Sequence, residues 1–304
     1  MSNSHTNKLL QSIVSSQLDA DRFDYMLRDS YMTGVHYGKF DINWMLKNLS
    51  IGEKVAEDED KTKHQREKTI VVDGRRGIST LQDYLIGLFN LYKHVYHHKT
   101  VLIAEGMLET ILNLAISYNN ANQGSNIDFS HAFFDRMSKG EEITLDEYLS
   151  LDDILISSWI HDWSESDKIP RELKNLSLHF LNRQLFKGFF VDLDGFALVN
   201  FMDKIKKVIE DDGFDPKIFL IMIDPKRMAY KNIFFMGKKD KGKQTNTQEE
   251  IHFLDRDNNI KMYTSDKEEL SEAIHKMKFE ELLVAFPKKY NDKICMIYKE
   301  YKNE

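Results

Sequence analysis

Over most of the first 190 residues, hydrophobic positions recur three and four residues apart, which is the spacing of an amphipathic helix. Ser, Pro and Gly near the ends of these stretches mark where the helices start and stop. The pattern predicts helices over 5–34, with Gly34 and Gly38 as stops, 40–49, Ser79 to about Ala121 with a bend near His97-His98, a short one around Phe134, 147–164 and 170–184. A strand over 69–72 runs into a turn at Asp73-Gly74.

After about residue 190 the pattern changes to short β-rich runs that alternate with helices. The predicted strands are 189–191, 218–223, 251–254 and 281–286, and the predicted helices are 200–211 and 266–277. Residues 237–248 contain few apolar side chains and are predicted to form a surface loop. We therefore expect a mainly α fold with two domains, a helical body over 1–190 and a smaller α+β lobe over 191–304.

Composition and charge narrow the class of protein. The chain has 304 residues, 41% of them hydrophobic, and a formal net charge of −7. A net negative charge disfavours broad attraction to nucleic acid or to anionic membranes. The single cysteine, Cys295, cannot form an internal disulfide, so we expect a cytoplasmic protein with no membrane partner.

Near the amino end, one predicted helix carries closely spaced polar side chains. Asp21, Tyr25 and Asp29 follow one another at intervals of four residues and therefore share one stripe of that helix. Two carboxylates and a phenol then point the same way. Composition alone favours the interpretation that they are surface charges and a core aromatic residue.

The segment from Gln17 to Asp29 resembles the fourth metal-ligand motif of the HD-superfamily phosphohydrolases, in the deoxynucleoside triphosphate triphosphohydrolase-like branch. Four further segments resemble that family in the same order: Thr69 to Gly77 with the helix that bears Tyr92 and Tyr96, Tyr148 to Asp153, Leu181 to Lys187, and Gly213-Phe-Asp-Pro216 through Phe253-Leu-Asp-Arg256. The resemblance implies a helical HD-type phosphohydrolase body, incomplete at its amino terminus, with an α+β carboxy-terminal lobe.

The resemblance also implies a role for each candidate residue. Asp21 would bind a divalent metal such as Mg²⁺ or Mn²⁺, for which a carboxylate is a suitable hard ligand. Substrate would be bound by five residues: Arg22 at phosphate oxygens, Tyr25 and Asp29 at phosphate and a sugar hydroxyl, and Tyr92 and Tyr96 beside the sugar. Tyr96 at C2′ would disfavour ribonucleotides. Beyond the metal ligand, the resemblance assigns this chain no catalytic residue.

Two positions depart from the family pattern. The family places a histidine and a His-Asp pair before the Asp21 segment, whereas His5 is the only histidine among the first twenty residues. One carboxylate cannot hold a catalytic metal alone, so we expect a partner chain or an upstream region to supply the other ligands. Leu88 stands where relatives commonly have a phosphate-binding arginine. His161 of the His161-Asp162 pair is expected to have a surface or capping role. His94 and His98 have a spacing that can bind Zn²⁺ but lack the accompanying carboxylate, so they are not expected to bind metal.

Three hypotheses remain open. The first is a subunit or shortened form of a metal-dependent nucleotide phosphohydrolase that is inactive as an isolated chain. The second is a catalytically inactive homologue that binds nucleotide or acts as a regulatory or structural subunit. The third is a nucleic-acid binder that uses the lysines of 238–243 and the charged run 61–68, which the net negative charge disfavours. Relatives self-associate, so a homo-oligomer is also expected.

Overall fold

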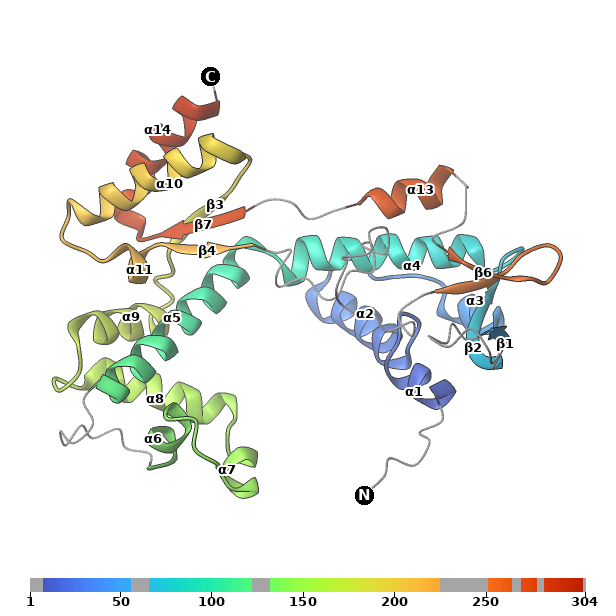
Figure 1. Cartoon of the computed structure of the whole chain (residues 1–304), viewed down its shortest axis with the longest axis horizontal. Helices are drawn as coiled ribbons and strands as arrows, with labels where there is room; N and C mark the ends of the chain where they lie inside the picture. Colours follow the sequence, from blue (N-terminus) through green and yellow to red (C-terminus); the bar gives the residue numbers. More distant parts are fainter. Residues whose placement is uncertain are drawn as a thin grey trace. The chain divides into compact units, whose positions relative to one another are not determined.

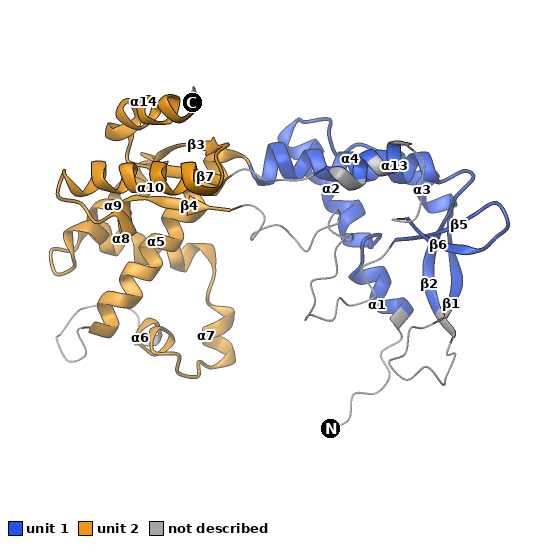
Figure 2. Cartoon of the chain, turned by 45° about the horizontal axis from the view of Figure 1, so that its top comes forward, with its two compact units in different colours: residues 1–97, 226–279 blue, residues 98–225, 280–304 orange. Residues whose placement is uncertain are grey.

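The computed structural model describes residues 8–55, 66–121, 132–224, 251–263, 269–277 and 282–302. The chain forms two compact units, Met1–His97 with Lys226–Phe279 and His98–Pro225 with Glu280–Glu304 (Figure 2). Most described elements are helices, with two small sheets, so the expected mainly α fold is confirmed. The units interleave along the chain and do not coincide with the expected division at residue 190.

The first unit combines helices with a four-stranded sheet (Figure 1). Its helices are α1 (Lys8–Val14), α2 (Ala20–Thr33), α3 (Ile42–Lys47), α4 (Ile78–Leu91) and α13 (Glu269–Lys276), and a π-helical turn, η1 (Tyr92–Tyr96), follows α4. The strands β1 (Leu49–Val55), β2 (Arg66–Asp73), β5 (His252–Leu254) and β6 (Ile260–Met262) pair in the order β1-β2-β5-β6. Only the β2–β5 pair is parallel among these.

Helices α2 and α4 meet through buried apolar side chains. Phe23 and Met26 of α2 belong to one core cluster with Tyr84, Leu85 and Leu88 of α4. Phe23 lies edge-on to Tyr84, with ring centroids 5.2 Å apart. This packing fixes the orientation of α2 on α4. The candidate residues of α2 are thereby held in a defined position relative to the end of α4.

The loop after α2 lies close against both helices. A Cβ atom on Gly38 would lie 2.4 Å from Oγ of Ser30, and one on Gly87 would lie 2.6 Å from the backbone oxygen of Tyr37. Both distances are too short for any side chain. Gly34 ends α2 with φ of 76°, in the left-handed region that suits glycine, and so confirms one of the two predicted helix stops.

The second unit packs helices around a three-stranded antiparallel sheet. Its strands are β3 (Lys187–Val191), β4 (Ile221–Ile223) and β7 (Leu282–Phe286), in the order β3-β7-β4. Its helices are α5 (Lys99–Ala121), α6 (Ala132–Ser138), α7 (Leu145–Leu149), α8 (Asp153–Glu165), α9 (Arg171–Leu181), α10 (Gly195–Glu210), α11 (Pro216–Phe219) and α14 (Asn291–Lys302), with a 3₁₀ turn, η4, at Lys288–Tyr290. Central strand β7 buries four consecutive apolar residues, Leu283 to Phe286.

Among the described helices, α5 alone is long and apolar enough to cross a membrane by length and composition. The same composition is found in helices that form the core of a soluble protein. Leu102, Ile103, Met107, Ile111 and Ala115 of α5 are buried within the hydrophobic core of the second unit. The apolar character of α5 is therefore explained in part by the packing of this unit.

Several expected elements need correction. The helix expected over 5–34 is two helices, because Asp19 folds back on Ser16 and starts a new helix at Ala20. The strand expected from Ile218 begins only at Ile221, because Pro216 opens the short helix α11. The helix expected over 147–164 is divided into α7 and α8 by Ser150 to Asp152. Residues 237–248 lie outside the described residues.

Candidate functional site

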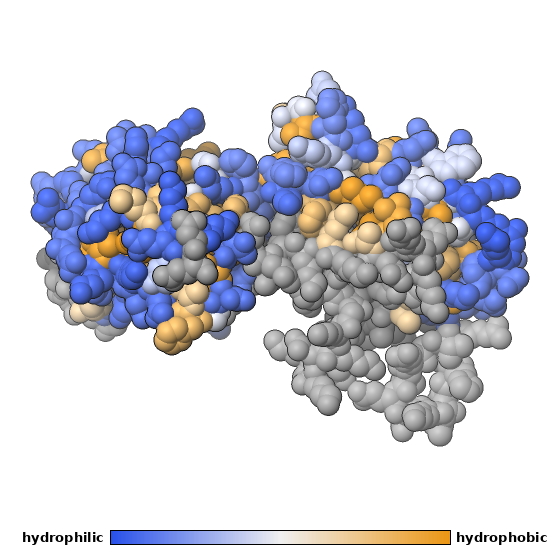
Figure 3. Space-filling view, turned by 90° about the horizontal axis from the view of Figure 1, so that it is seen from above, coloured by the Kyte–Doolittle hydropathy of each residue, from blue (hydrophilic) through white to orange (hydrophobic). Residues whose placement is uncertain are grey.

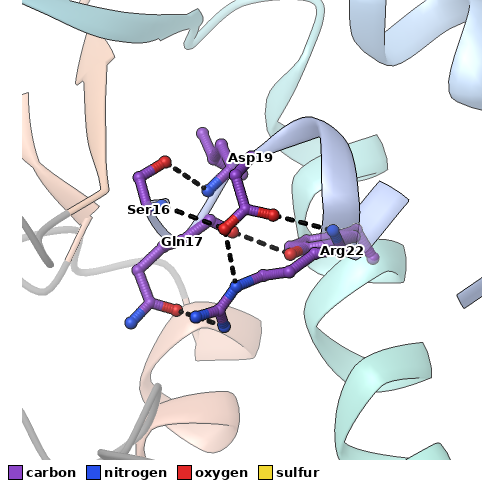
Figure 4. A network of polar contacts seen from close by, with 6 residues as sticks. Ser16, Gln17, Asp19 and Arg22 are labelled. Carbon is purple, nitrogen blue, oxygen red and sulfur yellow. Dashed lines mark hydrogen bonds and ion pairs between the residues drawn. The ribbon is translucent and has the colours of Figure 1, made fainter. Parts of the chain in front are cut away.

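Asp19 organises the start of α2 and is almost fully buried, with 4% of its surface exposed (Figure 4). Its carboxylate accepts hydrogen bonds from the backbone N–H of Ser16 at 2.9 Å and of Arg22 at 2.7 Å. Its Oδ2 also accepts a bond from Nε of Arg22 at 3.3 Å. The side chain therefore caps the helix and neutralises a nearby cation.

Arg22 is held within this network and is only 7% exposed. Its Nη1 donates to Oε1 of Gln17 at 3.3 Å, and the backbone oxygen of Gln17 accepts a 2.7 Å bond from the hydroxyl of Tyr84 (Figure 4). The guanidinium thus links the loop before α2 to its first turn. A direct contact with phosphate would require this group to share or exchange those partners.

Asp21 differs from Asp19 in its exposure to solvent. Its side chain is exposed in the first turn of α2, and no hydrogen bond or ion pair holds its carboxylate among the described residues. Nor do the described residues contain any group of three or more histidine, cysteine, aspartate or glutamate side chains that could hold a metal ion. The described part of the chain can therefore offer Asp21 as one ligand but does not by itself form a metal site.

Two turns further along α2, Asp29 makes a direct contact with η1. The hydroxyl of Tyr96 donates a 2.5 Å hydrogen bond to Oδ2 of Asp29. Tyr25 lies edge-on to Tyr96, with ring centroids 6.2 Å apart, and Tyr92 lies edge-on to Tyr96 at 5.0 Å. Four of the six candidate residues, Tyr25, Asp29, Tyr92 and Tyr96, therefore form one polar and aromatic cluster.

The π-helical turn brings Tyr92 and Tyr96 into this cluster. The N–H of His97 donates to the backbone oxygen of Tyr92 at 2.7 Å, five residues back, which is the hydrogen bond that defines a π turn. Such turns are often found at functional sites in helices. The helix expected from Ser79 to about Ala121 is interrupted near His97-His98, because η1 ends at Tyr96 and α5 begins at Lys99.

Burial changes the acid-base properties of the cluster. Burial and, next, the neighbouring Tyr92 side chain raise the pKa of Tyr25 far above its usual value. The buried hydroxyl of Tyr25 has no partner that meets hydrogen-bond geometry among the described residues, although the side chain of Tyr92 lies close enough to affect its pKa. Burial and the carboxylate of Asp29 raise the pKa of Tyr96, and burial lowers the pKa of His97. These phenols remain neutral donors at ordinary pH.

The structure also shows the surroundings of Leu88, His94 and His161, which the sequence analysis considered. Leu88 is fully buried in the core between α2 and α4, so it does not line an exposed surface. His94 is exposed and stacks on Tyr37, with ring centroids 5.1 Å apart. The side chain of His161 is 68% exposed and lies 3.9 Å from Asp162, in agreement with a surface role.

Sequence reasoning missed Asp19. Its signal was present, since an aspartate immediately before an amphipathic helix is a typical N-cap, and Arg22 follows at the spacing of the first turn. The helix expected to run unbroken from residue 5 to 34 concealed that cap. Asp19 and Asp21 therefore have different environments although only one residue separates them.

Comparisons with known proteins agree with this geometry at the level of fold. No protein-family model matches the chain. A solved structure, described as a phosphohydrolase from Bacteroides thetaiotaomicron, matches 93% of this chain with a TM-score of 0.64 at 24% sequence identity, and the match covers 65% of that protein. The fold of the chain is thus similar to that of a phosphohydrolase.

Two relatives of uncharacterised function match in sequence. YwfO of Bacillus subtilis is 30% identical over 229 residues, which are 74% of this chain and 47% of that protein. MJ1154 of Methanocaldococcus jannaschii is 25% identical over 225 residues, which are 74% of this chain and 43% of that protein. The chain therefore spans less than half the length of either relative.

Proposed function

We propose that this chain is a subunit or shortened form of a metal-dependent phosphohydrolase of the HD type that acts on nucleotides, resembling the deoxynucleoside triphosphate triphosphohydrolases. The observation that carries the proposal is the arrangement on α2: an exposed Asp21 carboxylate with no described partner, followed on the same stripe by Tyr25 and Asp29 in the cluster with Tyr96. The phosphohydrolase description of the solved neighbour supports the reaction class.

The described residues do not form a complete metal site, so further ligands would have to lie outside them. We propose that a partner chain or an upstream region carries a histidine and a His-Asp pair, and that Asp21 contributes one carboxylate oxygen to a divalent cation such as Mg²⁺ or Mn²⁺. When bound, such a cation would polarise a phosphoryl oxygen. Relatives more than twice as long as the match leave room for the missing groups.

The chain's own side chains would bind and orient the nucleotide. Asp29 accepts a hydrogen bond from the hydroxyl of Tyr96 and retains further lone pairs for a sugar hydroxyl. The Tyr25 hydroxyl, which lacks a hydrogen-bond acceptor among the described residues, can donate to a phosphate oxygen. Tyr92 and the ring of Tyr96 would pack against the sugar and disfavour a 2′-hydroxyl. Arg22 would reach a phosphate oxygen only by sharing or exchanging its contacts with Asp19 and Gln17.

A second candidate function has one observation in its favour. Leu88 replaces an expected cation with a fully buried apolar side chain, which would leave phosphate charge less well stabilised. The alternative is therefore a catalytically inactive homologue that binds nucleotide or acts as a regulatory or structural subunit. In either case a homo-oligomer is expected. Nucleic acid is a less suitable ligand, because the chain carries a formal net charge of −7.

The test measures release of phosphate or triphosphate from nucleotides by the full chain, alone and co-expressed with the reading frame upstream, with Mn²⁺ or Mg²⁺ present. The proposal expects activity only in the co-expressed sample and its loss in Asp21→Asn. Asp24→Asn is the matched control, because Asp24 is an exposed aspartate on the same helix outside the stripe. Nucleotide binding without hydrolysis supports the alternative, and absence of both binding and hydrolysis contradicts both.

A further inference from the structure

Helix α7 (Leu145–Leu149) exposes most of the surface of its apolar side chains. Leu145, Tyr148 and Leu149 are 71%, 63% and 69% exposed, and Ile154 in the first turn of α8 is 78% exposed. None of the five residues of α7 is buried. Figures 1 and 2 both place α7 at the periphery of its unit, next to α6 and α8. We call these four side chains the α7 patch.

Polar contacts, and not burial, keep α7 in place. Thr144 and Glu147 form a capping box in which each side chain binds the other's backbone N–H. Glu147 also forms an ion pair with Arg136 of α6. The patch therefore sits on a fixed helix, although no core contact of α7 itself requires its leucines. Clustered exposed apolar side chains on an ordered element are typical of an interaction surface.

The chain segment that carries the α7 patch is strongly acidic. Residues 141–166 contain eight acidic residues and no lysine or arginine: Glu141, Glu142, Asp146, Glu147, Asp152, Asp153, Asp162 and Glu165. The nearby cations are already engaged, Arg136 by Glu147 and Lys139 by Asp135. No described ion pair involves Glu142, Asp146 or Asp153, and all three are exposed. Figure 3 shows one face of the chain, on which smaller groups of apolar side chains (orange) are set in a largely hydrophilic surface.

The exposed face of α8 extends this acidic surface. Ile154, Ser157, Ser158, His161, Asp162 and Glu165 are all exposed, at the spacing of one helix face. The two serines are small and leave room for a neighbouring helix. The His161-Asp162 pair, which plays no part in the proposed metal site, belongs to this face.

We infer that the α7 patch and the adjoining face of α8 bind a basic amphipathic helix of another protein. Apolar side chains of that helix would cover Leu145, Tyr148, Leu149 and Ile154, while its lysines and arginines would meet Glu142, Asp146 and Asp153. Nucleic acid and anionic membranes are repelled by the same acidic rim. This surface lies in the second unit and does not depend on the proposed enzymatic function.

The test uses the full chain and a fluorescent 18-residue peptide of leucine and lysine with leucines at helical spacing. A peptide of the same composition with scattered leucines controls for charge alone. Fluorescence anisotropy should show that Leu145→Gln/Leu149→Gln/Ile154→Gln weakens binding of the amphipathic peptide about tenfold or more. Glu142→Gln/Asp146→Asn/Asp153→Asn should remove most of the dependence of binding on salt.

Phe196→Gln/Val199→Gln is the matched control, because those side chains are exposed apolar residues of α10 in the same unit. Circular dichroism checks that each variant is folded, which is expected since the substituted side chains are exposed. Equal binding of the peptide to the α7 variant and to the unsubstituted chain would overturn the inference. So would sedimentation showing a dimer that the α7 substitutions dissociate, because a second copy of the chain would then occupy the surface.

Discussion

Tyr96 donates a 2.5 Å hydrogen bond to the carboxylate of Asp29, and this contact joins the π-helical turn η1 to the third turn of α2. Residues 67 positions apart in sequence are thereby brought into one cluster. The contact also holds the ring of Tyr96 against Tyr25 and Tyr92. Any substrate that binds this cluster meets side chains whose positions are already fixed.

Loss of that hydrogen bond should destabilise the first unit. We expect Tyr96→Phe to lower the free energy of unfolding by about 1 kcal/mol, since a bond to a carboxylate at a half-buried site is removed. Urea unfolding followed by tyrosine and tryptophan fluorescence measures the change. Tyr31→Phe, at an exposed position on α2, should have no effect. Equal stability of the two variants would show that the contact contributes nothing.

Tyr25→Phe should have the opposite effect on stability. The Tyr25 hydroxyl is buried without a hydrogen bond among the described residues, so its removal should leave stability unchanged or raise it by about 1 kcal/mol. If Tyr25 donates to phosphate as proposed, the same variant should bind nucleotide about tenfold more weakly. Calorimetry would measure both. A less stable variant with unchanged nucleotide binding would assign Tyr25 a packing role alone.

Substitutions of Asp19 and Asp21 should differ in their effect on stability, because the first carboxylate has a structural role and the second is proposed to bind metal. Asp19→Ala removes the cap of α2 and leaves the buried Arg22 without its ion pair, which should cost about 3 kcal/mol in the free energy of unfolding. Asp21→Ala, at an exposed position, should change stability by about 0.5 kcal/mol or less. Chemical denaturation of both variants gives the comparison. Similar losses for both would contradict the distinction drawn from burial.

His97 should make stability depend on pH on the acid side. Burial lowers its pKa in the folded chain, so the unfolded chain binds the proton more readily. The stabilising contribution is therefore present above the usual histidine pKa and is lost as pH falls below it. Melting temperatures between pH 7 and pH 5 should fall less steeply in His97→Gln than in the unsubstituted chain. His94→Gln, at an exposed position, should leave the slope unchanged.

The sequence predicted helices where a periodic apolar face was long, as in α4 and α10, but it joined α1 and α2 into one helix. It missed β1, because Gly52, Glu53 and Lys54 weaken the strand pattern and the strand depends on its pairing with β2. It also left α14 unassigned, although Ile294 of that helix is fully buried in the core of the second unit. Both elements are stabilised by contacts with residues distant in sequence, which a local pattern does not reveal.

The candidate site was predicted in part. Helical spacing correctly placed Tyr25 and Asp29 on one side of α2, and both lie in the cluster with Tyr96. Spacing could not reveal that Arg22 is buried, because that depends on Asp19 and Gln17 in the preceding loop. Nor could it show that Asp21 is exposed. The proposed roles of these residues in binding and hydrolysis stay predictions.

The π turn at Tyr92–Tyr96 contains one more residue per turn than an α-helix would. Deleting Lys93, whose side chain is exposed, would let this segment return to ordinary α-helical winding with little change in composition. The angle per residue differs between a π turn and an α turn, so this deletion would change the relative directions of the Tyr92 and Tyr96 side chains. The cluster with Tyr25 and Asp29 therefore depends on the wider turn as well as on the residue types.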